Sequence, residues 1–439
     1  MNESIVAKFG GSSLSTGEQF KKVKKIIKDN NDRKYIVVSA PGKRNSKDYK
    51  ITDILYLCHA HVSHGISFDD VFKLIVDRYL GLKEELSIKV DIERYLSNIK
   101  KDIINGASKD YIASRGEFLN ALILADYIGY EFIDATDVIK FKQYGSIDYE
   151  ETDRAIKRNI LNKNGVVIPG FYGQLPNGEV KTFSRGGSDV TGSIIARGVN
   201  ARLYENWTDV SGFLMADPSI VKNPKTIEKI TYRELRELSY MGANVLHEDA
   251  MFPIKQYGIP INIKNTNRPE DKGTLIINDF IDKNTKGTIT GIAGKKNFSI
   301  IAIEKSKMNY EQGFCRKLLS ILETNGIQFE SMPSGIDTVS LVISNEQLKD
   351  KLDNILEEIR RQCIPDVIDV YSDISLIAIV GQGMVRTKGV SSKIFNSLSN
   401  SSVNIRLINQ GSSELNIIVG VENNDFEKSI NSIYEAFAS

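Results

Sequence analysis

The sequence predicts an α/β protein: a large domain in which helices cover both faces of a mainly parallel sheet (a three-layer αβα sandwich), followed by two smaller α+β modules. Three observations support this fold class. The chain of 439 residues exceeds what one hydrophobic core normally supports. Its first part alternates short β-branched runs with longer helical patterns, which is typical of βαβ units. Its last part shows a β-α-β-β-α order twice, at a spacing of roughly 75 residues, which indicates an internal duplication.

The elements of the large domain come in the order that a parallel sheet requires. Helices are expected at QFKKVKKIIKDN, over residues 51–64 and within residues 69–104. The segment NTNRPEDKG supplies turn and breaker residues, so the domain is expected to end near Leu275 and is assigned residues 1–280. Strands are expected at SIVAKF, KYIVVSA, VVIPGF, ARLYENW and INIKN.

The two C-terminal modules are assigned residues 298–371 and 372–439. Each begins with a strand and a helix, continues with two strands, and ends with a second helix. In the first module the two middle strands are IQFESM and TVSLVIS, and the second helix is QLKDKLDNILEEIRRQ. The first module can close with the strand VIDVY, whereas the second lacks a closing strand. We therefore expect the strand 287–294, which precedes the first module, to pair into the second.

The bulk composition excludes several classes of protein. The 57 basic and 56 acidic residues balance, so no overall field attracts nucleic acid or an anionic membrane. No segment approaches the roughly 18 apolar residues of a membrane span, and the N-terminus lacks the features of a signal peptide. The three cysteines lie far apart, which gives neither a disulfide framework nor a metal-binding pair. We expect a cytoplasmic protein whose partners are small molecules and copies of itself.

Two glycine-rich loops are expected where strands give way to helices. In KFGGSS, glycines let backbone N–H groups approach phosphate oxygens, and Lys8 can neutralise a transferring phosphoryl group. In SRGGSD, the guanidinium of Arg185 can hold a carboxylate and Asp189 can hold an ammonium group. Alone, each loop also fits a simple βα turn or an N-capped helix start. Together they suit a site with two anionic reactants.

A third segment, WTDVSGFLMADP, begins at the end of an expected strand. Open α/β sheets bind ligands at the carboxyl ends of their strands, so Thr208 and Asp209 can line a nucleotide pocket. Five further segments, SAPGKR, KITDIL, SRGE, PGFYG and GANVLH, follow the same order as in one known family. With them, the chain from Lys8 to about Leu275 resembles the aspartate kinases of the amino-acid-kinase family. The repeated C-terminal units resemble the paired, ferredoxin-like ACT domains of those enzymes.

This resemblance implies a nucleotide side and an aspartate side. Lys8 would bridge the phosphates of ATP, Arg185 would grip the α-carboxylate of aspartate, and Glu117 would pair with its α-ammonium group. The implied catalytic residues are Lys8, Arg185 and Asp189. The implied ATP-binding residues are Lys8, Gly10, Gly11, Ser12, Thr208, Asp209, Leu214, Asp217, Asn244 and Val245. The implied aspartate-binding residues are Ser39, Thr52, Glu117, Phe171, Arg185, Gly186, Gly187, Ser188 and Asp189.

The reaction implied is transfer of the γ-phosphate of ATP to the side-chain carboxylate of aspartate, the first step towards lysine, threonine and methionine. An ionised carboxylate is already a nucleophile, so alignment and charge neutralisation suffice, with Mg²⁺ brought in by ATP and no resident metal. The ACT units imply feedback inhibition by an amino acid, lysine before threonine, and a homodimer or dimer of dimers. The implied effector-binding residues are Met308, Gly313, Phe314, Glu330, Ser331 and Met384.

The sequence departs from the family's pattern on the nucleotide side. Asn244 stands where the family often has lysine, and Leu214 and Ser219 replace a tyrosine and an arginine. Lys222 or Lys225 can restore the missing positive charge. Two other functions stay open: a kinase for another small carboxylate, and a non-catalytic amino-acid sensor or regulatory subunit.

Overall fold

The computed structural model describes residues 3–184, 186–243, 252–278 and 288–438. The chain forms two compact units. The first contains Met1–Phe213, Thr226–Arg233 and Asn244–Ile281. The second contains Asp282–Ser439 together with two segments from the preceding part of the chain, Leu214–Lys225 and Glu234–Ala243. The division that we expect from sequence, at residue 280 with modules at 298–371 and 372–439, remains a proposal. Among the described residues, no helix is both long and apolar enough to span a membrane.

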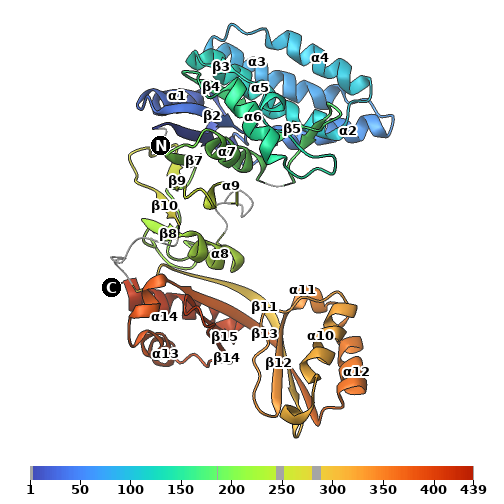
Figure 1. Ribbon diagram of the computed structural model, residues 1–439, viewed down its shortest axis with the longest axis vertical. Helices are drawn as coiled ribbons and strands as arrows, with labels where there is room; N and C mark the ends of the chain where they lie inside the picture. The colour runs from blue at the N-terminus through green and yellow to red at the C-terminus, as the bar shows by residue number, and fades with distance from the viewer. Residues whose placement is uncertain (1–2, 185, 244–251, 279–287, 439) are drawn as a thin grey trace. The chain divides into compact units, whose positions relative to one another are not determined.

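The first unit is built on an eight-stranded sheet in the order β3-β4-β2-β1-β7-β9-β10-β8 (Figure 1). The strands from β3 to β9 are parallel, β10 runs antiparallel to β9, and β8 runs parallel to β10. This confirms the expected mainly parallel sheet. Its strands are β1 (Ile5–Phe9), β2 (Arg33–Val38), β3 (Glu131–Phe132), β4 (Val166–Pro169), β7 (Leu203–Thr208), β8 (Lys229–Thr231), β9 (Ile261–Asn265) and β10 (Thr274–Ile277). A separate hairpin joins β5 (Tyr172–Gln174) to β6 (Val180–Thr182).

Helices cover both faces of this sheet, as the three-layer architecture requires. On one face, apolar side chains of β1 and β2 such as Phe9 and Val38 form one core with five helices, α1 to α5. On the other face α7 contacts β1, β2 and β7, and it is flanked by α6 and α9. The helices are α1 (Gly17–Lys28), α2 (Ile51–Ser63), α3 (Asp69–Leu86), α4 (Ile92–Ile104), α5 (Lys109–Ile128), α6 (Tyr149–Asn159), α7 (Gly187–Gly198) and α9 (Phe252–Lys255). Helix α8 (Tyr232–Tyr240) follows β8.

The second unit contains a five-stranded antiparallel sheet in the order β12-β11-β13-β15-β14. Its strands β11 (Gly291–Glu304) and β13 (Val367–Val380) are 14 residues long, and each passes through both modules. Residues 298–304 of β11 pair with β12 (Thr338–Ser344) and with the first half of β13. Residues 291–295 of β11 pair instead with residues 376–380 of β13, next to β15 (Asn416–Glu422) and β14 (Leu407–Asn409). Of the strand expected at 287–294, residues 291–294 thus lie in a strand beside those of the second module, residues 288–290 precede that strand, and residue 287 lies outside the described residues.

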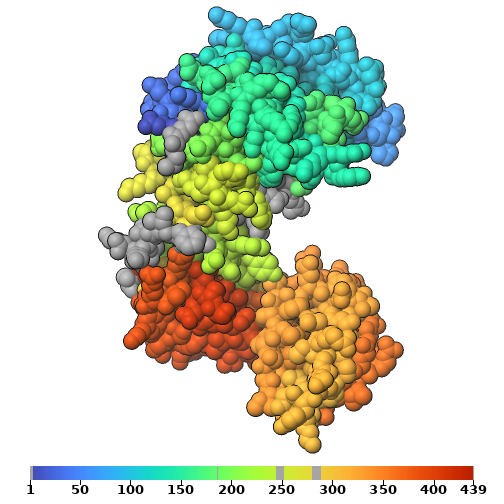
Figure 2. Space-filling view, in the orientation of Figure 1, coloured from blue at the N-terminus to red at the C-terminus, as the bar shows by residue number. Residues whose placement is uncertain are grey.

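Each module has its own helices and its own core. In the first module α10 (Phe314–Thr324), α11 (Asn345–Leu348) and α12 (Leu352–Cys363) surround a core that includes Leu341. In the second, α13 (Val390–Asn400) and α14 (Phe426–Ala438) enclose a core that includes Val419. In Figure 2 the two modules form adjoining lobes, one orange and one red.

Two expected elements of the first module are wrong in detail. The strand IQFESM is replaced by extended chain that makes an isolated bridge, from Ser331 to Val342. The helix expected from QLKDKLDNILEEIRRQ is divided into α11 and α12. The break falls where Asp350 takes φ +61°, a left-handed conformation that a continuous helix excludes.

Candidate active site

The carboxyl ends of four parallel strands bring the sequence motifs to one edge of the sheet. Strands β1, β2, β4 and β7 are neighbours and run in the same direction. Gly10 follows β1, Ser39 follows β2, Phe171 lies just beyond β4, and Thr208 ends β7. Open α/β sheets bind ligands at this edge, so the fold places these four expected site residues where a substrate can reach them.

The lysine of the first glycine loop meets the aspartate of the second. Lys8 Nζ lies 2.6 Å from Asp189 Oδ1, and the two side chains are 9% and 18% exposed. Asp189 lies in the first turn of α7, where the helix dipole favours a negative charge. The structure therefore joins the KFGGSS and SRGGSD loops through a largely buried ion pair, which fixes the position of the lysine ammonium group.

The KFGG loop packs closely against neighbouring backbone, and Gly11 is required there. The Gly10 N–H group donates to the Trp207 carbonyl over 2.9 Å, and the Gly42 N–H group donates to the Gly11 carbonyl over 2.8 Å. A Cβ atom on Gly11 would lie 2.8 Å from the Ala40 carbonyl oxygen, a distance that side chains do not tolerate. Ser12 follows in the same loop. The loop after β1 is thus held directly against the loop after β2, which contains Ser39.

Glu117 is a buried carboxyl group on α5. It is 5% exposed, and burial raises its pKa to about 8, against a weaker lowering by a backbone N–H donor at Ala40. Its Oε2 atom has no hydrogen-bond partner among the described residues. One turn later, Asn120 donates to the Ser39 carbonyl over 2.6 Å. A buried carboxyl oxygen without a partner is costly, so this position suits an incoming ammonium group.

Phe171 has a strained backbone next to the second glycine loop. Its φ of +80° is rare for a bulky residue, and such strain concentrates at functional sites. Its N–H group donates to Thr191 Oγ1 over 3.0 Å. A Cβ atom on Gly187 would lie 2.6 Å from the Phe171 ring, so this glycine allows the close approach. Gly186, with φ +56°, precedes α7, and Ser188 is buried in the first turn of that helix. The remaining expected residue of the aspartate side, Thr52, is half-buried in the first turn of α2.

The residues expected on the nucleotide side divide between the two units. In the first unit, Thr208 donates its hydroxyl to Asp209 Oδ1 over 3.1 Å. Leu214 and Asp217 belong to the second unit, where Asp217 accepts from the N–H and hydroxyl groups of Ser219. Three expected site residues lie outside the described residues: Arg185, Asn244 and Val245.

Of the two lysines considered as replacements for the missing positive charge, Lys225 is engaged within the second unit. Its ammonium group donates to the Ala438 carbonyl, and its N–H group donates to the Tyr434 hydroxyl over 2.9 Å. Lys222 is exposed. The role of either lysine towards a nucleotide stays a prediction.

Sequence reasoning missed Asn206, which contacts the Lys8–Asp189 pair. Its Nδ2 atom donates to Asp189 Oδ1 over 2.8 Å, and the residue is 4% exposed. One signal was visible: the expected strand ARLYENW contains the adjacent polar residues Glu205 and Asn206. Strands in the middle of a parallel sheet are usually continuous apolar runs, so polar residues there require partners.

The expected effector residues of the first module differ in accessibility. The side chains of Met308 and Phe314 lie in the module's hydrophobic core, as Met384 does in the second. Gly313 precedes α10 with φ +79°. Glu330 is half-buried, and its Oε2 atom accepts a hydrogen bond from the Tyr240 hydroxyl over 2.7 Å. In the first module, Glu330 and Ser331 are thus the more accessible side chains of this set, while Met384 also lines a hollow of the second module.

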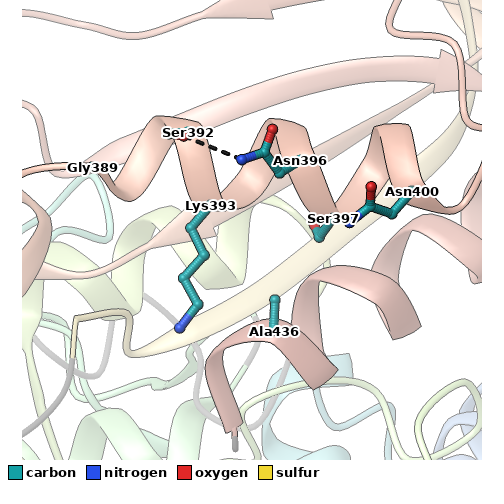
Figure 3. A pocket seen from close by; sticks show the side chains of 7 residues that line it. All are labelled: Gly389, Ser392, Lys393, Asn396, Ser397, Asn400 and Ala436. Carbon is teal, nitrogen blue, oxygen red and sulfur yellow. Dashed lines mark hydrogen bonds between the residues drawn. The ribbon is translucent and has the colours of Figure 1, made fainter.

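The corresponding loops of the second module surround a hollow of about 340 Å³. Arg386 and Lys388 lie on one loop and Glu414 on the other, so the hollow is lined by both basic and acidic side chains. Figure 3 shows a second hollow, of about 380 Å³, on the outer surface of α13 and α14. There Asn396 donates to Ser392 on the same helix over 3.3 Å, and Lys393 extends towards α14.

Comparison with known proteins identifies the family and the fold. The sequence model of the amino acid kinase family matches residues 3–265, and that of an ACT domain matches residues 377–437. The chain is 37% identical to aspartokinase 3 of Bacillus subtilis over 98% of both chains. It is 63% identical to the crystallised aspartate kinase of Clostridium acetobutylicum, with a TM-score of 0.93 over 99% of this chain and all of that one. E. coli aspartokinase III, crystallised with lysine and aspartate, shares the fold at a TM-score of 0.76 and 23% identity over the full length of both chains.

The chain therefore belongs to the amino acid kinase family and, within it, to the aspartate kinases with C-terminal ACT domains.

Proposed function

We propose that the enzyme phosphorylates the side-chain carboxylate of aspartate with MgATP, giving 4-phosphoaspartate and ADP. The Lys8–Asp189 ion pair at the carboxyl edge of the sheet is the observation that carries this proposal, because it holds a cation where two anionic reactants must meet. E. coli aspartokinase III has been crystallised with aspartate and ADP, which supports the same pair of ligands here. We also propose a cytoplasmic enzyme of the pathway towards lysine, threonine and methionine.

The reaction needs alignment rather than a general base. A carboxylate oxygen of aspartate attacks the γ-phosphorus, the bond from that phosphorus to the bridging β,γ-oxygen breaks, and ADP leaves with the electron pair. Negative charge spreads over the transferring phosphoryl oxygens, where Lys8 and the N–H groups of the Gly10–Ser12 loop stabilise it. Among the described residues, no cluster of His, Cys, Asp and Glu could hold a metal ion. We propose Mg²⁺ as part of the MgATP substrate, bound through phosphate oxygens.

The aspartate substrate is expected to lie between α5 and the second glycine loop. Glu117 would accept its ammonium group and Arg185 would hold its α-carboxylate, while Ser39 and the strained turn at Phe171 would shape the pocket. Binding of the ammonium group would return the proton of Glu117 to solvent, because an adjacent cation favours the ionised carboxylate.

We propose that lysine is the inhibitory effector and threonine the next candidate. Glu330 can accept the ε-ammonium group of lysine, and E. coli aspartokinase III has been crystallised with lysine and aspartate. In the present conformation Glu330 accepts from Tyr240 on α8, so an effector ammonium group would compete with this hydroxyl. A homodimer or a dimer of dimers through the ACT modules is the assembly that we propose.

Trapping of the acyl phosphate as its hydroxamate tests this function. Purified enzyme, ATP and Mg²⁺ should yield hydroxamate with aspartate and much less with glutamate, and added lysine should suppress the yield. Glutamate as the better substrate would identify a kinase for another small carboxylate. If no acceptor gives hydroxamate, lysine binding measured by calorimetry would leave the non-catalytic sensor as the function.

A further inference from the structure

Strand β7 contains two adjacent buried polar residues in the interior of a parallel sheet. Glu205 and Asn206 are each 4% exposed, although strands in this position are normally apolar throughout. Glu205 has structural partners: Arg33 Nε at 2.7 Å and Trp207 Nε1 at 2.9 Å. These contacts satisfy the buried carboxylate of Glu205 and do not involve Lys8 or Asp189. Asn206 requires a different explanation.

Asn206 and Lys8 are paired in register on the neighbouring strands β7 and β1. Side chains at paired positions project from the same face of a sheet, here the face that α7 covers. Both side chains converge on one atom, Asp189 Oδ1: Lys8 Nζ at 2.6 Å and Asn206 Nδ2 at 2.8 Å. The carboxylate of Asp189 is thus held from two strands at once.

The second donor has a consequence for catalysis. During phosphoryl transfer, Lys8 must direct hydrogen bonds to phosphoryl oxygens, which weakens its hold on Asp189. A largely buried carboxylate that loses its cation becomes costly and is free to rotate. The Asn206 amide carries no charge and cannot titrate, so it keeps Asp189 Oδ1 satisfied throughout the reaction.

We propose that Asn206 is a positioning residue for phosphoryl transfer: it fixes the Asp189 carboxylate so that Lys8 stays aligned with the transferring phosphoryl group. This inference rests on the proposed function. It assigns Asn206 no contact with either substrate, so its effect must pass through Asp189 and appear in turnover more than in aspartate binding.

Replacement of the amide by an apolar group of similar size tests the proposal. The variant N206L should lower kcat about 10- to 100-fold, the size expected when a hydrogen bond to a charged group is lost. The KM for aspartate should change much less. N206D has the same shape but offers no donor and adds a second carboxylate beside Asp189, so its kcat should fall at least as far.

Asn262 provides a matched control on the neighbouring strand β9. It pairs in register with Glu205, and its Oδ1 atom has no hydrogen-bond partner among the described residues. N262L should retain the kcat of the unmodified enzyme. Thermal unfolding, followed by the fluorescence of the single tryptophan, Trp207, shows whether each variant is folded.

A double-mutant cycle separates positioning from a general structural role. MgADP affinity would be measured by calorimetry for the unmodified enzyme, N206L, D189N and the double variant, so that the cycle does not depend on residual turnover. If Asn206 acts through Asp189, N206L should change the affinity less in the D189N background than alone. Additive effects in this cycle, or a kcat for N206L equal to that of N262L, would overturn the proposal. If the unmodified enzyme makes no hydroxamate, the proposed function fails, while the binding cycle still tests the coupling.

Discussion

The catalytic and regulatory regions hold their charged groups in different ways. In the catalytic unit, Lys8 and Asp189 form a largely buried ion pair, and Glu117 is 5% exposed with its pKa raised by burial. In the regulatory unit, Glu330 is half-buried, and its partner Tyr240 is 57% exposed. Buried charges resist rearrangement, whereas a hydrogen bond near solvent exchanges its partner at low cost. The proposed catalytic site is therefore preorganised, and the proposed effector site is suited to switching.

The largest effect should come from removing the preorganised cation. K8M deletes the ammonium group and leaves Asp189 buried without it, so kcat in the hydroxamate assay should fall about 10²- to 10³-fold or more. K8R keeps a charge of different shape and should lose less. If K8M retained more than a tenth of the activity, the ion pair would be structural and the catalytic side of the comparison would fail.

Glu117 should show the next largest effect, on aspartate affinity. E117Q removes the carboxylate proposed to hold the ammonium group, and the KM for aspartate should rise about 10-fold or more, while the KM for ATP changes little. Because the Glu117 pKa lies at about 8, the carboxyl group is neutral below that pH. The KM for aspartate should therefore fall as pH rises through about 8, and E117Q should lose this dependence.

The same pKa predicts how stability depends on pH. The value in the folded enzyme lies above the ordinary carboxyl value of 4.5, so the folded state binds a proton more tightly than the unfolded state. Glu117 thus disfavours folding increasingly as pH rises from about 4.5 to 8. In thermal unfolding scans without substrate, E117Q should gain stability over the unmodified enzyme as pH increases. A constant difference across that range would argue against a protonated Glu117.

Glu330 tests the regulatory side. E330Q removes the negative charge proposed for the ε-ammonium group, so the lysine concentration for half-inhibition should rise about 10-fold, with kcat in the absence of lysine unchanged. The similar change E346Q, in α11 of the same module, serves as the control. Unaltered inhibition in E330Q would move the effector site elsewhere in the ACT modules.

The smallest and most informative effect is expected from Tyr240. Y240F removes the hydroxyl that competes for Glu330, so lysine should inhibit at a concentration about 2- to 10-fold lower. The lysine concentration for half-inhibition is expected to fall in Y240F and to rise in E330Q. A merely structural role of the Glu330–Tyr240 hydrogen bond would not move it in opposite directions. Weaker inhibition in Y240F would mean that Tyr240 helps to bind the effector rather than competing with it.

The sequence predicted the sheet and the two glycine-rich loops at its edge because their signals are local. Strands such as Ile5–Phe9 show in β-branched runs, and the KFGGSS and SRGGSD motifs carry their chemistry in adjacent residues. The contact of Asn206 with Asp189 was not predictable, because it depends on which helix packs against which strand. The Glu330–Tyr240 contact is non-local for the same reason, since 90 residues separate the two.

The errors in the first ACT module also have a physical cause. The run IQFESM has the composition of a strand, but a strand forms by pairing, and only Ser331 within it bridges to Val342. The fusion of VIDVY with DISLIAIV into one strand depends likewise on β11, which lies beside both halves. Periodicity shows which residues are able to form strands, and distant partners decide where those strands end.

The two long strands of the regulatory unit have a mechanical consequence. Because β11 and β13 each pass from one module into the other, a cut near Tyr371 would sever a strand in mid-course instead of releasing two intact domains. The pairing of β11 with β13 is irregular where the strands cross between the modules, from Lys295 to Phe298, and Asn297 and Asp373 there take φ values of +71° and +60°. We therefore expect the two ACT modules to unfold together, because each depends on strands that the other also uses.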